Sequence, residues 1–96
     1  EMTQDDGLRI DKFLWFSRLT RTRSLAQKIA EKGHIRCAGR RIDRAHTVVR
    51  VGDVLSVPMP DGVRVLRIES LPERRVPAKL VDEIYSRVER ISDTKR

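Results

Sequence analysis

The 96-residue sequence has a single cysteine and no long apolar run, and both absences restrict what the protein can be. A lone Cys37 excludes an internal disulfide, which argues against a secreted, disulfide-stapled domain and for a reducing compartment. No apolar run approaches the roughly 20 residues that a membrane span needs. The first residues, EMTQDDG, are acidic and polar, unlike a signal peptide. We therefore expect a cytoplasmic protein with no membrane partner.

Recognisable catalytic and metal-binding patterns are also missing from the sequence. The two histidines, His34 and His46, do not belong to a metal-ligand pattern. The sequence shows no nucleophile–base pair, paired carboxylates or glycine-rich phosphate loop. We expect no metal, no cofactor and no enzymatic activity, and we interpret Cys37 as a small buried hydrophobe in a strand.

Positive charge is abundant, and it is concentrated in one half of the chain. The net charge is +7, with 21 Lys and Arg against 14 Asp and Glu. Residues 8–50 contribute +9 and residues 51–96 only +1. A one-sided field of this kind attracts polyanions. The alternative interpretation is an ordinary solvated surface.

Apolar spacing predicts two short helices at the start of the domain. Ile10, Phe13, Leu14 and Ser17 follow the i, i+3, i+4, i+7 pattern, and Asp11 lies where a carboxylate complements a helix N-terminus.

The second helix has two candidate N-caps: Ser24, which forms a capping box with Gln27, and Thr22. It ends at Gly33, whose residue type suits the left-handed conformation after a helix. Its expected buried residues are Leu25, Ala26, Ile29 and Ala30.

Beyond Gly33 the pattern changes to short strands. Residues 34–37 and 40–43 flank Ala38-Gly39, which predicts a hairpin, and further strands are expected at 54–57 and 63–68. After a linker, an amphipathic helix is predicted from Ala78 with its apolar positions continuing to Ile91. The fold class is α+β. We expect a disordered lead over 1–7, a domain over 8–70, and a linker and packed C-terminal helix over 71–96.

The basic side chains of the first half, with their polar neighbours, form a candidate nucleic-acid surface over two helices and a hairpin. Arginine predominates, and its planar fork suits bidentate contacts with phosphate. The candidate residues are Arg9, Lys12, Arg18, Arg21, Thr22, Arg23, Ser24, Gln27, Lys28, Lys32, Arg36, Arg40, Arg41 and Arg44.

Two aromatic residues, Trp15 and Phe16, cannot both share the apolar stripe of Phe13. One interpretation packs them beneath the C-terminal helix. The other exposes one of them for stacking or for a partner. The sequence leaves both open.

The order of these motifs resembles the alpha-L RNA-binding domain first seen in small-subunit ribosomal protein four. The resemblance covers about residues 8–57 and rests on the following elements: Arg9-Ile10-Asp11-Lys12, Thr22-Arg23, Ala26, Ile29, Gly33, Ala38-Gly39 and Val51-Gly52-Asp53. The later segment with Arg75, Pro77, Ala78 and Tyr85 is similar to the heat-shock protein 15 family. That family usually carries Asn-Gly where this chain has Ala38-Gly39.

The resemblance implies two short helices packed on a small, bent antiparallel sheet, plus a C-terminal helix. It implies a ribosome-associated stress-response protein that binds structured ribosomal RNA of the large subunit. The subunits bound would include stalled ones that still carry tRNA, in a rescue or recycling role. Asp11 would orient Arg9 or cap the helix. Two alternatives remain: binding to duplex DNA through the helix pair, or a protein-interaction module that uses the C-terminal helix.

Overall fold

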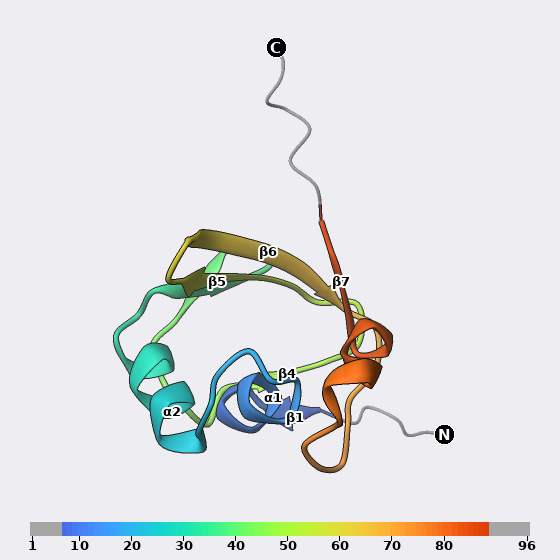
Figure 1. The fold of residues 1–96 in the computed structure, drawn as a ribbon. Coiled ribbons are helices and arrows are strands. Elements are labelled where there is room, and N and C mark those ends of the chain that lie inside the picture. The colour runs from blue at the N-terminus through green and yellow to red at the C-terminus, as the bar shows by residue number, and fades with distance from the viewer. Residues whose placement is uncertain (1–6, 89–96) are drawn as a thin grey trace.

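Two helices lie beneath an antiparallel sheet in the computed structural model, which describes residues 7–88 (Figure 1). The elements, in chain order, are β1 Leu8–Arg9, α1 Ile10–Phe16, α2 Arg23–Glu31, β2 Ile35–Cys37, β3 Arg40–Ile42, β4 Val48–Val49, β5 Val54–Met59, β6 Gly62–Ile68, the 3₁₀ helix η1 Ala78–Glu83 and β7 Tyr85–Arg87. This arrangement confirms the α+β class with helices on one side of a small sheet.

The strands form two antiparallel sheets. The larger has the order β3-β2-β5-β6-β7, and β1 pairs with β4 in a two-stranded ribbon next to α1. Strands β5 and β6 form a hairpin in which Leu55 faces Leu66 and Val57 faces Arg64. The β1–β4 ribbon was not expected from the sequence, because two-residue strands are too short for a periodicity signal.

The core lies between the sheet and α1. Phe13 and Leu14 on the helix, and Ile35, Leu55 and Leu66 on the strands, have no solvent exposure. Full burial of a side chain of this size contributes about 1.5–3 kcal/mol before entropy is counted. Alternation along the strands leaves Arg36 and Arg67 on the opposite, outer face of the sheet.

The start of α2 settles which residue caps it. The Thr22 hydroxyl accepts a hydrogen bond from the Leu25 backbone N–H at 3.1 Å, so Thr22 is the N-cap. The expected burial of Leu25 is wrong, because its side chain is 42% exposed. The expected burial of Ala26 and Ala30 is confirmed, because both are fully buried, and Ile29 is partly buried against the core. The two alanines form the buried side of α2, and Leu25 falls outside it.

Backbone conformation confirms the expected hairpin between β2 and β3. Ala38 and Gly39 have φ values of 53° and 84°. Two consecutive positive φ values match the type I′ turn that suits the twist of a two-residue hairpin. Gly33 also has a positive φ, 78°, and follows the C-cap Lys32 of α2.

The C-terminal helix predicted from the sequence is wrong in its extent. A helical segment begins at Ala78, but it is the 3₁₀ helix η1 and ends at Glu83. Tyr85 pairs with Ile68, so the next residues form the edge strand β7 rather than further helical turns. Pairing with β6 gives the backbone N–H and C=O groups of β7 hydrogen-bond partners. The segment still buries apolar surface, because Ile84, just before β7, is only 6% exposed. The rest of that helix, from residue 89, and residues 1–6 of the predicted lead lie outside the described residues.

Candidate nucleic-acid interface

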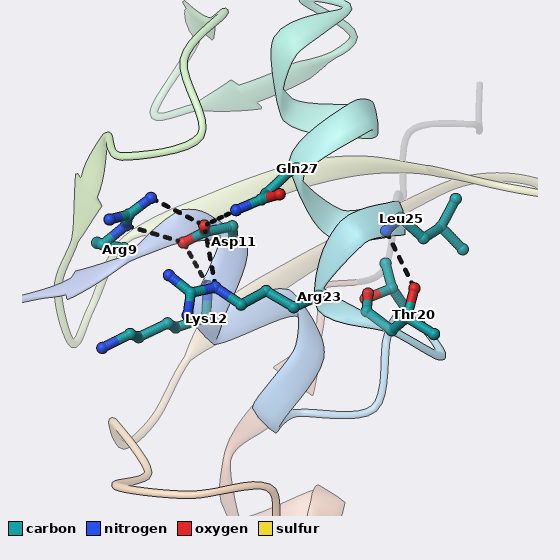
Figure 2. Close-up of polar contacts among 8 residues, drawn as sticks. Arg9, Asp11, Lys12, Thr20, Arg23, Leu25 and Gln27 are labelled. Carbon is teal, nitrogen blue, oxygen red and sulfur yellow. Dashed lines mark hydrogen bonds and ion pairs between the residues drawn. The ribbon is translucent and has the colours of Figure 1, made fainter.

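A buried carboxylate, Asp11, connects three of the predicted site residues (Figure 2). Arg9 donates from Nε to Oδ1 at 3.1 Å and from Nη2 to Oδ2 at 3.0 Å, a bidentate pair. Arg23 donates from Nε to Oδ2 at 3.3 Å, and Gln27 from Nε2 to the same oxygen at 3.2 Å. The donors come from β1 and α2, whereas Asp11 lies on α1. We call Asp11, Arg9, Arg23 and Gln27 the Asp11 cluster.

The ionised form of Asp11 is favoured despite its burial. Burial by itself raises the pKa of a carboxyl, but hydrogen bonds from Gln27, from Arg9 and from the Lys12 backbone N–H outweigh it. The pKa of Asp11 is therefore lowered from its usual value. Asp11 is thus a fixed anion that holds two arginines in place.

The two arginines of the Asp11 cluster remain accessible. Their side chains are 42% exposed for Arg9 and 37% exposed for Arg23, whereas that of Asp11 is fully buried. A guanidinium has five N–H donors, and Asp11 engages only some of them. Lys12, the next residue, directs its ammonium group away from Asp11 (Figure 2). This end of α1 therefore presents cations whose positions are restrained from behind.

Most of the predicted residues on α2 and the preceding loop are exposed. Arg21, Ser24, Lys28 and Lys32 are all open to solvent, while Gln27 is half-buried in the Asp11 cluster. Ser24 lies in the first turn of α2, and Lys28 and Lys32 follow at intervals of four residues, so they share one face. This face extends the positive surface along α2.

Arg18, at the other end of α1, has a structural contact. Its Nε donates to the Val76 carbonyl at 2.6 Å, and its backbone has a positive φ of 66°. Arg75 donates from Nε to the Trp15 carbonyl at 3.2 Å, and the Val76 N–H donates to the Phe16 carbonyl at 3.0 Å. The Val76 N–H thus pairs with the Phe16 carbonyl at the end of α1, and Arg75 adds a second donor to the Trp15 carbonyl, which also accepts from the Arg18 backbone N–H at 3.1 Å. Sequence reasoning missed this role of Arg75; the signal available was its place in the Arg-x-Pro-Ala motif.

The hairpin arginines are divided between surfaces. Arg36 and Arg41 lie directly opposite each other on β2 and β3, on the outer face of the sheet, and alternation places Arg40 on the other face. Arg41 donates from Nε to the Gly33 carbonyl at 3.1 Å, so it reaches the end of α2. The Arg44 side chain is 71% exposed, and its Nε atom lies 4.0 Å from Oδ1 of Asp43. Such an exposed ion pair contributes little to stability. The structure therefore does not gather all of the predicted residues into one patch.

The lone cysteine has a protonated, weakly nucleophilic thiol. Burial, with a contribution from the nearby Asp53 carboxylate, raises the pKa of Cys37 to about 11. Cys37 is only partly buried, and it packs against the core. Within residues 7–88, no group of three His, Cys, Asp or Glu side chains could hold a metal ion. The same described part of the chain has no helix of the length and apolar character that crossing a membrane requires.

Comparison with known proteins gives one family match and several relatives. The S4 domain model matches residues 8–55, half of the chain. Heat shock protein 15 of Escherichia coli is 29% identical over 78 residues, which are 81% of this chain. The chain spans only 58% of the length of that relative. The RQC P-site tRNA stabilizing factor of Halalkalibacterium halodurans is 36% identical over 66 residues, 69% of this chain and 74% of the factor.

A solved structure has the same fold. It is described as the trimeric structure of Vibrio cholerae Heat Shock Protein 15, and it superposes with a TM-score of 0.80 at 26% sequence identity. The match covers 86% of this chain and 83% of that one.

Proposed function

The chain belongs to the S4 domain family, and from this premise we propose that it binds structured RNA through the Asp11 cluster and the exposed face of α2. The observation that carries the proposal is the pair of half-exposed arginines held on one buried carboxylate. Binding requires no catalytic step and no cofactor.

Restraint of Arg9 and Arg23 favours binding because less side-chain freedom is lost when a phosphate arrives. Asp11 offsets one of their two positive charges, and Lys12 adds another next to them. Guanidinium groups at set positions can recognise the spacing of phosphates along a folded RNA, whose deep major groove excludes side chains. The proposed recognition is therefore of shape and backbone.

The finer part of the proposal is a ribosomal target. We propose that the RNA is ribosomal RNA of the large subunit, in a rescue or recycling role on stalled subunits that carry tRNA. Two observations support it: relatives named heat shock protein 15, and another named for stabilising a P-site tRNA. Such a role places the protein in the cytoplasm. On the exposed face of α2 the contacts would come from Ser24, Lys28 and Lys32. The remaining predicted residues would contribute more weakly or through structure: Arg18, Arg21, Thr22, Arg36, Arg40, Arg41 and Arg44.

Titration of a labelled ribosomal RNA fragment at several salt concentrations tests the binding. Arg23→Ala should weaken affinity and lower the salt slope by about one unit, because one phosphate contact is lost. Arg67→Ala is the matched control: it removes an equally charged, exposed arginine from the outer face of β6. Equal losses in the two variants would mean that only net charge matters, and would overturn the proposed site. Tighter binding of duplex DNA than RNA at matched salt would overturn the RNA assignment.

Asp11→Asn provides a sharper version of the same test. The substitution makes the net charge more positive by one, so long-range electrostatics alone would strengthen RNA binding. We expect weaker binding, because Arg9 and Arg23 lose their common anchor. For the ribosomal target, sedimentation of a cell extract should show co-migration with free large subunits. Recovery only at the top of the gradient would contradict that target and leave the RNA-binding proposal to the titration.

A further inference from the structure

The outer face of α1 consists of one lysine and two aromatic residues. Of the seven residues of this helix, Ile10, Asp11, Phe13 and Leu14 are buried. The three that are not buried are Lys12, Trp15 and Phe16. At about 100° per residue, these three positions fall within one sector of the helix. The sequence left Trp15 and Phe16 unassigned, and the structure places both on this outer face.

The two aromatic rings form a tilted pair on that face. Their centroids are 5.5 Å apart and their planes make an angle of 38°. Both side chains are only partly buried. In this they differ from Phe13, which is fully buried. Tyr85 is also partly buried, but it packs against the core cluster, whereas Trp15 and Phe16 are not among the residues that pack on that cluster. Aromatic surface left at the boundary with solvent is available for a ligand.

Cationic groups lie at both ends of the same helix. Arg9 and Arg23 meet Asp11 near its start. Near its end, Arg75 is anchored on the Trp15 carbonyl and Arg18 on the Val76 carbonyl. Arg18 and Arg75 each use only the Nε donor in these hydrogen bonds. A guanidinium has five N–H donors, so the other donors of each group can contact a ligand. The aromatic pair is therefore framed by positive charge along the helix.

We infer that Trp15 and Phe16 form a stacking platform for an unpaired RNA base. The inference rests on the proposed RNA binding and specifies which part of an RNA this face takes. Aromatic side chains flanked by cations are the usual means of holding a splayed base while its phosphates are neutralised. An apolar protein segment would offer no negative charge to the arginines on either side of the aromatic pair, whereas the phosphates of a nucleic acid would. Charge complementarity therefore favours the nucleic acid.

Only a base outside a continuous duplex can use such a platform. Inside a paired helix both faces of each internal base are covered by neighbouring bases, so an aromatic ring cannot reach them. The platform therefore predicts a preference that the phosphate contacts alone do not produce. Two RNAs with the same charge should differ in affinity when one of them contains a bulged base.

The single tryptophan of the chain makes the contact measurable. The test uses two hairpin RNAs with the same loop, one with a fully paired stem and one with a bulged adenosine in the stem, so that the bulged base is the difference between them. Tryptophan emission is excited at the long-wavelength edge of the protein absorption, where tyrosine absorbs little. Affinity is read independently by anisotropy of end-labelled RNA. We expect quenching and tighter binding with the bulged hairpin, and much less of both with the paired one.

Variants separate stacking from electrostatics. Trp15→Ala should weaken binding of the bulged hairpin by about tenfold without changing the salt slope, because no charge is removed. Trp15→Phe retains an aromatic face and should recover much of the loss, which also guards against a merely unfolded Ala variant. Leu25→Ala is the control, since it removes an exposed apolar side chain from α2. Unchanged emission on saturation with bulged RNA, together with wild-type affinity of Trp15→Phe and Trp15→Ala, would overturn the platform but not RNA binding. Absence of any anisotropy change would overturn both proposals.

Discussion

The Nε atom of Arg23 lies 3.3 Å from the Oδ2 atom of Asp11, which ties the first turn of α2 to the first turn of α1. The residues are twelve positions apart in the chain. The contact therefore has two consequences, one for how the helices pack and one for where a cation is presented.

Asp11→Asn should lower the free energy of unfolding by about 2 kcal/mol, the usual contribution of hydrogen bonds to a charged group. The neutral amide cannot accept equally well from Arg9, Arg23 and Gln27. Urea unfolding followed by circular dichroism measures the change. Asp43→Asn is the control, because its carboxylate is 64% exposed and lies 4.0 Å from Arg44; it should change stability by less than about 0.5 kcal/mol. Equal effects would show that Asp11 has no special structural role.

The contribution of Asp11 should depend on pH with a defined sign. Its pKa is lowered in the folded protein from the usual value of 3.8, so the unfolded chain binds the proton more tightly. The stabilisation is therefore complete above that value and is lost as pH falls through the folded pKa. We expect the stability difference between wild type and Asp11→Asn to be constant from neutral pH down to about pH 5 and to shrink at lower pH. A difference that does not vary down to pH 2 would contradict this assignment.

Thr22→Ala should destabilise the domain by about 1 kcal/mol, the typical cost of losing an N-cap. The hydroxyl accepts from the Leu25 N–H at 3.1 Å, and alanine leaves that donor without it. Ser24→Ala is the matched control inside the first turn of α2, and it should change stability by no more than a few tenths of a kcal/mol. Thermal unfolding of both variants decides between the two caps. A larger effect at Ser24 would reverse the assignment.

Ala38→Asn should stabilise the hairpin by about 0.5–1 kcal/mol, because asparagine tolerates the left-handed conformation better than alanine. Ala38 has a φ of 53°, and the following Gly39 is also in the left-handed region. The melting temperature should rise accordingly. Ala38→Val is the opposite test: a β-branched residue at positive φ should lower it. No difference between the two variants would argue against a type I′ turn at this position.

The interior of the domain follows from sequence because its signals are local. The i, i+3, i+4 spacing of Ile10, Phe13 and Leu14 specifies a buried face, and all three have no solvent exposure. In β5, Leu55 and Val57 alternate with Ser56 and are both fully buried. In β6 the pattern misleads, because Val63 and Val65 alternate with arginines, but Leu66 and Ile68 are the buried residues and Val63 is exposed. Leu25 shows the limit of this reasoning: its hydrophobicity suggests burial, but the small Ala26 and Ala30 are the buried residues of α2.

The fold class, the positively charged half and the Ala38-Gly39 turn could be predicted from the sequence. So could the order of motifs that marks the family. Each of these depends on residues that are close together in the chain. Which side chains surround Asp11 depends on how the two helices pack, since Arg23 and Gln27 approach it from α2. The tertiary structure also decided that Tyr85–Arg87 pairs with β6 instead of extending a helix, because an open sheet edge satisfies backbone hydrogen bonds that no local propensity encodes. Finally, it placed Trp15 and Phe16 on the outer face of α1, since the buried face of that short helix is already occupied by other side chains.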